Sequence, residues 1–259
     1  MVELSGMNDE IHAIILKQMD YREKDILFTV LSKEYGKLSF VASGARKLTS
    51  KNAGALLPYS YANITFDYHE NKSIFRLKTA HTLQLYPMIH KDLLRTSAAS
   101  LVCSLMDFMS LSLNEDGLAI EQFDLLHTTL QFLEEKKDVH SVVALFICDV
   151  LSMFGSAPYV DGCVVCHQDG VSGISVKDGG FVCKKHALIE NVPILNKNDL
   201  KRFRILCKVT LKRYALIEDE VQGTLQDVEY LVRFAHTYTG FSLETFQFYK
   251  QVCELNKIV

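Results

Sequence analysis

Four side chains that can bind a metal form two close pairs in the second half of the chain. Cys163 and Cys166 are separated by two residues, and after sixteen intervening residues the same spacing recurs in Cys183 and His186. Two such pairs, roughly 15–20 residues apart, are typical of a knuckle or ribbon that holds zinc in a tetrahedron. Four protein ligands leave no open coordination position, so the spacing predicts a structural and not a catalytic zinc ion.

The fourth ligand is open at this stage. His186 could instead begin a following helix, so that His167 or a water molecule completes the site, and the cluster could also lack a metal. Three nearby glycines, Gly162, Gly179 and Gly180, supply the backbone freedom that a knuckle needs. Loss of a bound metal should unfold this segment locally, because the binding free energy is also folding free energy.

The remaining cysteines stand alone in mostly apolar or helical surroundings: Cys103, Cys148, Cys207 and Cys253. Such positions are typical of core residues. Because the chain is long and its seven cysteines are an odd number, a metal explains the clustered cysteines better than a disulfide framework does.

No catalytic signature accompanies these residues. The chain contains no nucleophile elbow, phosphate-binding P-loop, zinc-protease HExxH or dinucleotide GxGxxG motif, and its other histidines are scattered. The segment Ser43–Lys47 resembles a phosphate-contacting turn, since a strand end and a glycine are followed by two cations. We therefore expect a binding protein and not an enzyme.

Length and composition narrow the class of protein. The 259 residues, 48% of them apolar, suit one or two globular domains and exclude a disordered chain. No uncharged apolar run reaches the roughly 18 residues that cross a bilayer, and the acidic N-terminus lacks the apolar core of a signal peptide. We expect a soluble cytoplasmic protein.

The net charge of −3 conceals an uneven distribution. Lys33–Lys51 has a net charge of +4 and Lys184–Arg213 of +7, whereas Asp107–Asp138 has a net charge of −6. Each run could be an ordinary solvated face or part of a binding surface. The acidic run would repel DNA and should face away from it.

The elements that position these residues change character along the chain. Five segments with period-2 alternation or short apolar runs predict strands: Ile11–Lys17, Asp25–Ser32, Lys37–Ser43, Tyr61–Tyr68 and Ser73–Thr79. Five strands at this spacing suit a small closed barrel, with a loop or short helix over Gly44–Ser60. We expect this barrel domain to span residues 1–82.

Helical periodicity begins near Leu93. It predicts a face with Leu101, Leu105, Phe108 and Met109, a face with Ile120, Phe123, Leu126, Leu130 and Leu133, and helices over Val139–Phe154, Asn198–Ile217, Asp227–Tyr238 and Ser242–Leu255. We expect an α+β protein whose helical domain spans residues 83–259. The long irregular stretch at about residues 158–193 interrupts the helices and would be the zinc-binding insert.

Several motifs carry a family resemblance over nearly the whole chain. At the N-terminus they are Tyr21, Glu23, Asp25, Gly36, Lys37, Gly44, Ala45, Arg46, Lys47, Leu56 or Leu57, Pro58 and Tyr59. Further on, Gly179–Cys183 reads Gly-Gly-Phe-Val-Cys, and the stretch after Gly240 forms the closing segment. Together they resemble the RecO family of bacterial DNA repair and recombination mediators, although His186 stands where a cysteine is common.

The resemblance implies an OB-fold at the N-terminus, a helical C-terminal domain and a zinc insert. It implies a cytoplasmic, nucleoid-associated protein that is not an enzyme, binds single- and double-stranded DNA and anneals complementary strands. It also implies work with RecR, and sometimes RecF, in loading RecA onto DNA coated with single-strand-binding protein.

An OB-fold binds single strands through cations and exposed aromatic rings. We predict phosphate contacts from Lys37, Arg46, Lys47, Lys51, Arg76 and Lys78, with Arg46 and Lys47 the best candidates. The aromatic rings nearby are Phe40, Tyr59, Tyr61 and Tyr68, each of which could be core or stacking platform.

A second basic group would extend the DNA path or bind the acidic tail of single-strand-binding protein, unless it is a solvated helix face. Its members are Lys201, Arg202, Arg204, Lys208 and Lys212. The alternative function is a protein-interaction scaffold with incidental DNA contact, from which a steep salt dependence of DNA affinity would distinguish a mediator.

Overall fold

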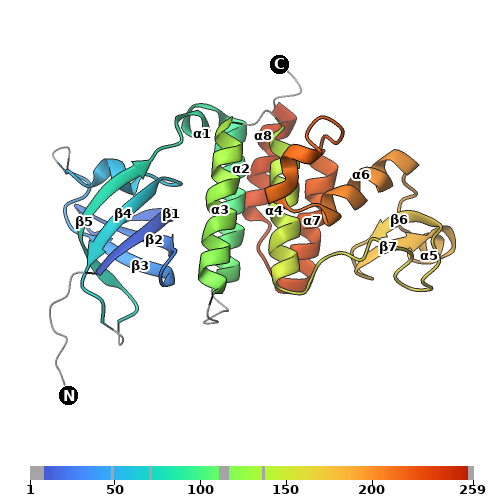
Figure 1. Cartoon of the computed structure of the whole chain (residues 1–259), viewed down its shortest axis with the longest axis horizontal. Coiled ribbons are helices and arrows are strands. Elements are labelled where there is room, and N and C mark those ends of the chain that lie inside the picture. The colour runs from blue at the N-terminus through green and yellow to red at the C-terminus, as the bar shows by residue number, and fades with distance from the viewer. Residues whose placement is uncertain (1–8, 48–49, 70–71, 111–116, 136–137, 256–259) are drawn as a thin grey trace. The chain divides into compact units, whose positions relative to one another are not determined.

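The computed structural model describes residues 9–47, 50–69, 72–110, 117–135 and 138–255 (Figure 1). The chain divides into two compact units. Residues 1–91 and 103–134 form the first, and residues 92–102 and 135–259 form the second. The fold is α+β, as the sequence predicts, with a barrel in the first unit and a helical bundle in the second.

Five strands close into a barrel in the order β1-β2-β3-β5-β4, which is the arrangement of an OB-fold. β3 and β5 pair in parallel, and every other neighbouring pair is antiparallel. The strands are β1 (Asp9–Tyr21), β2 (Asp25–Ser32), β3 (Gly36–Ala42), β4 (Tyr61–Phe66) and β5 (Phe75–Gln84). The five predicted strands are confirmed, and β1 and β5 extend beyond their predicted ends.

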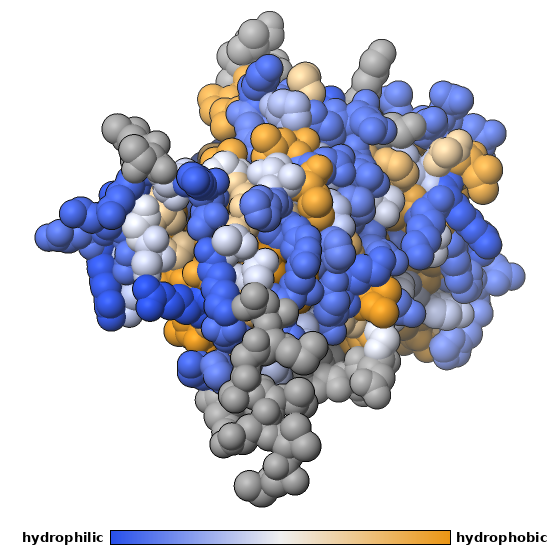
Figure 2. Space-filling model, turned by 60° about the vertical axis from the view of Figure 1, so that its left-hand side comes forward, coloured by the Kyte–Doolittle hydropathy of each residue, from blue (hydrophilic) through white to orange (hydrophobic). Residues whose placement is uncertain are grey.

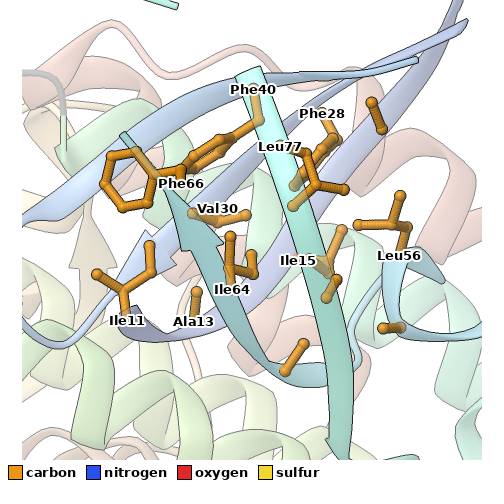
Figure 3. Close-up of a cluster of buried hydrophobic side chains, with 14 of the residues drawn as sticks. Ile11, Ala13, Ile15, Phe28, Val30, Phe40, Leu56, Ile64, Phe66 and Leu77 are labelled. Carbon is orange, nitrogen blue, oxygen red and sulfur yellow. The ribbon is translucent and has the colours of Figure 1, made fainter. Parts of the chain in front are cut away.

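The barrel interior is filled by the alternating apolar side chains that predicted the strands. Figure 3 shows Phe28, Val30 and Phe40 directed into the same core as Ile64 and other residues of β1 and β5. Closure pairs the barrel edges, which would otherwise offer unpaired backbone groups to other chains.

The chain between β3 and β4 forms a short 3-10 helix, η1 (Ala53–Leu56), as the loop prediction allows. Leu56 is fully buried and belongs to the barrel core. β4 ends at Phe66, so Tyr68 lies beyond the strand and is exposed, although alternation placed it with Ala62 and Ile64.

Three helices follow the barrel: α1 (Pro87–Lys91), α2 (Leu93–Met109) and α3 (Leu118–Glu135). The predicted apolar face of α3 is buried at Phe123, Leu126, Leu130 and Leu133, whereas Ile120, in the first turn, is exposed. Of the acidic run Asp107–Asp138, residues 111–116 and 136–137 lie outside the described part of the chain.

The second unit is built around α4 (Val139–Met153), which packs against α6 (Lys197–Lys208) and α7 (Leu225–Thr239). α4 is buried almost all round, as its apolar sequence predicts. α7 begins with a capping box between Thr224 and Asp227 and ends at Gly240, whose φ of 82° favours glycine. The last helix is α8 (Glu244–Leu255).

The predicted helix over Asn198–Ile217 is wrong in its length. α6 ends at Lys208, Val209 and Thr210 are extended, and a separate 3-10 helix, η3, covers Leu211–Leu216. Leu211 and Tyr214 are both buried, so the apolar spacing continues across the break although the helix does not.

The stretch from Pro158 to Pro193 is more regular than its sequence predicts. It contains the antiparallel pair β6 (Val171–Ser175) and β7 (Gly180–Cys183), followed by the short helix α5 (Lys184–Ile189). At Gly180 an added Cβ would lie 2.2 Å from the carbonyl oxygen of Tyr159, so this close approach requires glycine.

Within the described part of the chain, no helix combines the length and the apolar character that a membrane crossing requires. The face drawn in Figure 2 is largely hydrophilic, with apolar residues scattered among the polar ones.

Candidate metal centre and nucleic-acid groove

The four side chains of the predicted metal site converge in the insert. The ligand atoms of Cys163, Cys166, Cys183 and His186 all lie within 4.8 Å of one another. The His186 Nδ1 atom is 3.3 Å from Cys163 Sγ and 3.2 Å from Cys183 Sγ, and Cys166 Sγ is 3.9 Å from Cys183 Sγ. This group could hold a metal ion.

These distances suit a tetrahedral ion. Zinc at about 2.3 Å from sulfur and about 2.0 Å from nitrogen would place its ligand atoms roughly 3.5–3.8 Å apart. The cysteine sulfurs are free thiols rather than a disulfide, whose sulfur atoms would be about 2.05 Å apart. His167, the alternative fourth ligand, is exposed and packs its ring edge-on against Tyr159, outside this group.

The backbone holds the first pair in a tight knuckle. The Cys163 carbonyl oxygen accepts from His167 N–H at 2.7 Å, and Cys163 N–H donates to the Gln168 carbonyl oxygen at 2.8 Å. Burial raises the pKa of the Cys163 thiol, but backbone N–H groups of Cys183, Cys166 and Val165 and the His186 side chain together lower it to about 6. The thiolate, which is the metal-binding form, is therefore favoured at neutral pH.

The insert is anchored to the helices of its unit at two places. Asp161, two residues before the first ligand, accepts from Arg204 at 2.9 Å and from Lys208 at 2.6 Å. On the hairpin side, the Tyr238 hydroxyl donates to the carbonyl oxygens of Val176 and Lys177 at 2.9 and 3.0 Å. These contacts tie the metal-binding segment to α6 and α7.

The basic group of α6 is largely engaged within the protein. Arg202 pairs with the buried carboxylate of Asp227 at 2.7 Å and with Asp199 at 2.7 Å. Arg204 and Lys208 are held by Asp161, and Lys212 lies beyond the helix on η3. Lys201 is exposed at the rim of a 360 Å³ pocket, whose other lining residues are Asn198, Arg202, Ile205, Glu220, Val221 and Gln222.

A second hollow lies on the barrel. This groove, which we call the barrel groove, has a volume of 370 Å³ and is lined by Arg22, Asp25, Val41, Ser43, Lys72, Ile74, Phe75 and Arg76. It joins the β1–β2 connection, the end of β3 and the β4–β5 connection. Three of its lining residues are cationic, against one carboxylate.

The predicted phosphate-contacting turn borders the same end of the barrel. Gly44 N–H donates to the Asp25 carboxylate at 2.9 Å, and Arg46 N–H donates to the Lys24 carbonyl oxygen at 3.2 Å. Arg46 and Lys47 are exposed, and Arg46 also pairs with Asp20 at 3.1 Å. Lys51 is exposed farther along this connection.

Two predicted DNA-contacting lysines have carboxylate partners instead. Lys37 is mostly buried and lies 2.5 Å from Asp107 of α2, which also binds Lys17 at 2.7 Å. Lys78 pairs with Asp67. The structure therefore gathers Arg76 into the barrel groove, with Arg46 and Lys47 beside it, and places Lys37 and Lys78 in ion pairs.

Two cations of the barrel groove, Arg22 and Lys72, were not among the residues predicted from the sequence. They lie in the connections after β1 and β4, about fifty residues apart in the chain, and barrel closure alone brings them to one hollow. The topology of an OB-fold is the signal that could have found them, because its β1–β2 and β4–β5 loops border the ligand site.

Among the predicted aromatic candidates, Phe40 is a core residue with no exposed surface. Tyr61 packs on His127 and Phe123 of α3, with ring centroids 5.0 and 5.6 Å away. Tyr59 stacks with His90 at 6.1 Å, whereas Tyr68 is 38% exposed.

Comparison with known proteins agrees with both parts of the architecture. Residues 7–86 match the family model for the N-terminal part of recombination protein O, and residues 90–218 match that for its C-terminal part. The chain is 27% identical to the DNA repair protein RecO of Halalkalibacterium halodurans over 253 residues, covering 95% of this chain and 96% of that protein. It is 26% identical to the DNA repair protein RecO of Oceanobacillus iheyensis over 241 residues, covering 92% of each. With an OB-fold barrel, a helical unit and matches to both family models, the chain belongs to the RecO family of DNA repair proteins.

Proposed function

We propose that this protein binds single- and double-stranded DNA without catalysing a reaction, and anneals complementary strands. The observation that carries the proposal is the barrel groove. OB-folds bind oligonucleotides on strands 2 and 3, between the β1–β2 and β4–β5 loops. Here those two loops contribute Arg22 and Lys72, and Arg76 of β5 adds a third positive charge.

Phosphate neutralisation explains how the groove would act on any sequence. Cations that displace counterions from the DNA backbone give an affinity that falls steeply with salt and does not depend on the bases. Arg46 and Lys47 would extend this path beside the groove, since both are exposed on the turn next to Lys24.

The test measures fluorescence anisotropy of a labelled single strand at several salt concentrations, followed by addition of the complementary strand. We expect tight binding with a steep salt slope and accelerated annealing. Arg22→Ala combined with Arg76→Ala should weaken binding and flatten the slope. The matched control combines Lys177→Ala with Lys250→Ala, which removes the same charge from exposed ion pairs in the other unit. This control should change neither the DNA affinity nor its salt slope. Weak, salt-insensitive binding would favour the protein-interaction scaffold.

We also propose that the protein acts in the cytoplasm, on the nucleoid, and helps RecR, in some settings with RecF, to load RecA onto coated single strands. Support comes from the family membership and from relatives named DNA repair proteins. RecA-dependent ATP hydrolysis on a strand coated with single-strand-binding protein should rise only when this protein and RecR are both present. An unchanged rate would contradict the proposal.

For the tail of single-strand-binding protein we propose the pocket beside α6. An acidic peptide with an apolar end needs a cation beside apolar side chains, and this pocket offers Lys201 next to Ile205 and Val221, whereas Arg202 in the same lining is paired with Asp199 and Asp227 and Glu220 adds one carboxylate. Lys201→Glu should abolish binding of a labelled tail peptide. Lys212→Glu makes the same charge change outside the pocket and should leave binding intact.

We propose that the metal is zinc and that its role is structural. Three thiolates and one imidazole form a closed soft donor set that suits zinc, and they come from one folded insert. Elemental analysis of the purified protein should find about one zinc per chain. Cys163→Ser should lower both the zinc content and the thermal midpoint, and full stability without metal would contradict the structural role.

A further inference from the structure

Two exposed tyrosines stack on each other at the barrel surface. Tyr35 lies in the β2–β3 connection and is 43% exposed, and Tyr68 follows β4 and is 38% exposed. Their ring centroids are 5.0 Å apart and the ring planes differ by 18°. Two loops distant in sequence thus present parallel aromatic rings to solvent.

This pair is held rigidly from below. Tyr68 stacks on Phe75, with centroids 5.5 Å apart and planes 19° apart, and the buried ring of Phe66 meets both tyrosines edge-on. Asp9 accepts from Tyr68 N–H at 3.1 Å and from the Tyr35 hydroxyl at 3.4 Å. A ring already fixed in place loses little conformational freedom when a ligand stacks on it.

The stack is continuous with the barrel groove. Phe75 contacts Tyr68 on one side and, together with Ile74, lines the groove that holds Arg22, Lys72 and Arg76. A strand whose phosphates lie against these cations would therefore have its bases within reach of an aromatic surface.

From this arrangement we infer that the outer face of Tyr35, backed by Tyr68, is a stacking platform for unpaired nucleobases, and that it sets a preference for single-stranded over double-stranded DNA. The inference rests on the proposed DNA binding. A single strand can splay its bases onto an aromatic ring, whereas a duplex keeps its bases stacked inside. Phosphate contacts contribute to the binding of both single-stranded and double-stranded DNA. A difference between the two affinities must therefore come from the stacking platform.

The experiment measures the affinity of the full-length protein for a single strand and for a duplex of the same sequence at fixed salt. Tyr35→Ala and Tyr68→Ala should each weaken single-strand binding about tenfold and leave duplex binding and the salt slope unchanged. Tyr35→Phe and Tyr68→Phe keep the ring and should bind as the unaltered protein does. Phe248→Ala removes an exposed ring from α8 and is the matched control.

A second readout uses a single strand that contains 2-aminopurine, whose fluorescence is quenched when the base stacks. Quenching by the unaltered protein should be lost in Tyr35→Leu, which retains an apolar side chain and protects the fold where alanine destabilises it. Quenching that persists in Tyr35→Leu and Tyr68→Leu, or equal losses of single-strand and duplex affinity, would overturn the platform.

Failure of the platform and failure of DNA binding are distinguishable. If the unaltered protein binds with a steep salt slope that Arg22→Ala with Arg76→Ala flattens, while the tyrosine variants bind normally, the platform alone is refuted. If the unaltered protein shows no salt-dependent binding, the proposed function fails and the platform fails with it.

Discussion

Asp107 forms an ion pair with Lys37, one of the lysines predicted to contact DNA. It lies 2.5 Å from Lys37, whose side chain is only 16% exposed, and 2.7 Å from the more exposed Lys17. Removing a partner from a mostly buried ion pair leaves an uncompensated charge, whereas an exposed pair contributes little. The main role of the Lys37 charge is therefore to pair with Asp107 and so stabilise the contact between the barrel and α2.

We expect Asp107→Asn to lower the free energy of unfolding by about 2 kcal/mol, because Lys37 loses its counter-charge in a mostly buried position. Asp124→Asn disrupts the exposed pair with Lys33, 3.4 Å apart, and should cost less than about 0.5 kcal/mol. Urea denaturation of both variants at pH 7 measures the difference. Equal costs would show that burial of Lys37 is not the deciding factor.

A second prediction at this scale concerns pH. Burial raises the pKa of Asp149 to about 6, although Leu211 N–H and Lys212 lower it. The folded state thus holds the proton more tightly than the unfolded state, whose pKa is about 3.9. The contribution of Asp149 to the free energy of unfolding is therefore greatest below about pH 4, and it is lost as the pH rises through about 6.

Asp149→Asn removes that titration. The unaltered protein should lose up to about 2 kcal/mol relative to the variant between pH 4 and pH 7, since the charged form must then be buried. Comparing the two pH profiles by chemical denaturation isolates this carboxylate from the others. Parallel profiles would contradict the raised pKa.

Residues with local partners were predictable from sequence, and those with distant partners were not. Spacing predicts Cys163, Cys166 and Cys183 as a cluster because they are close in the chain, whereas it leaves His186 and His167 as alternatives for the fourth position, and the structure places His186 with the cysteines. Arg204 and Lys208 read as a free basic face, yet both meet Asp161, more than forty residues earlier. A charge count along the chain cannot find such a partner.

At the scale of elements, the insert is a small unit whose core is thin. The cluster of buried side chains around the candidate metal site comprises Cys163, Val182, Cys183 and Ala187, so two of the four candidate ligands make up half of that cluster. Without metal, these few side chains cannot offset the chain entropy of the fold.

Removing the metal with a chelator should therefore unfold the insert locally. Hydrogen exchange should become fast in residues 158–193, while β1–β5 keep their protection because the barrel has its own core. Adding zinc back should restore protection. Slow exchange in β6 and β7 after complete metal removal would contradict this dependence.

The strand elements were predicted well, since alternation in the barrel is read directly from the sequence. The end of α6 was not. Leu211 and Tyr214 continue the apolar spacing and are buried, but the β-branched pair Val209 and Thr210 adopts an extended backbone that breaks the helix. Periodicity reports which side chains are buried and not whether the backbone between them stays helical.

At the scale of the whole molecule, the metal centre and the barrel groove belong to different compact units. We expect them to be independent. Chelation should leave the salt slope of DNA binding unchanged, whereas Arg22→Ala with Arg76→Ala should flatten the slope and leave the zinc content unchanged. Anisotropy and elemental analysis on the same samples check both halves. A slope that falls on chelation would show that the insert supplies phosphate contacts.

The set of residues that line the barrel groove could not be predicted from the sequence, and the closure of the barrel explains why. Closure pairs β3 with β5 and brings residues from three separate connections to one groove. Family resemblance supplied the OB-fold, but it did not indicate that Arg22 and Lys72 meet there. Sequence patterns along the chain do not show which distant residues a closed sheet brings together.

The four metal ligands occupy a single stretch of 24 residues, from Cys163 to His186, and this has a consequence for the order of events during synthesis. Closing so short a loop costs little entropy, and domains fold as the chain emerges from the ribosome. A knuckle that binds an ion would therefore close before α6 has emerged from the ribosome. Arg204 and Lys208 would then meet Asp161 already fixed beside a closed insert. If the insert needs its ion to fold, a shortage of metal would act on the nascent chain rather than on the finished protein.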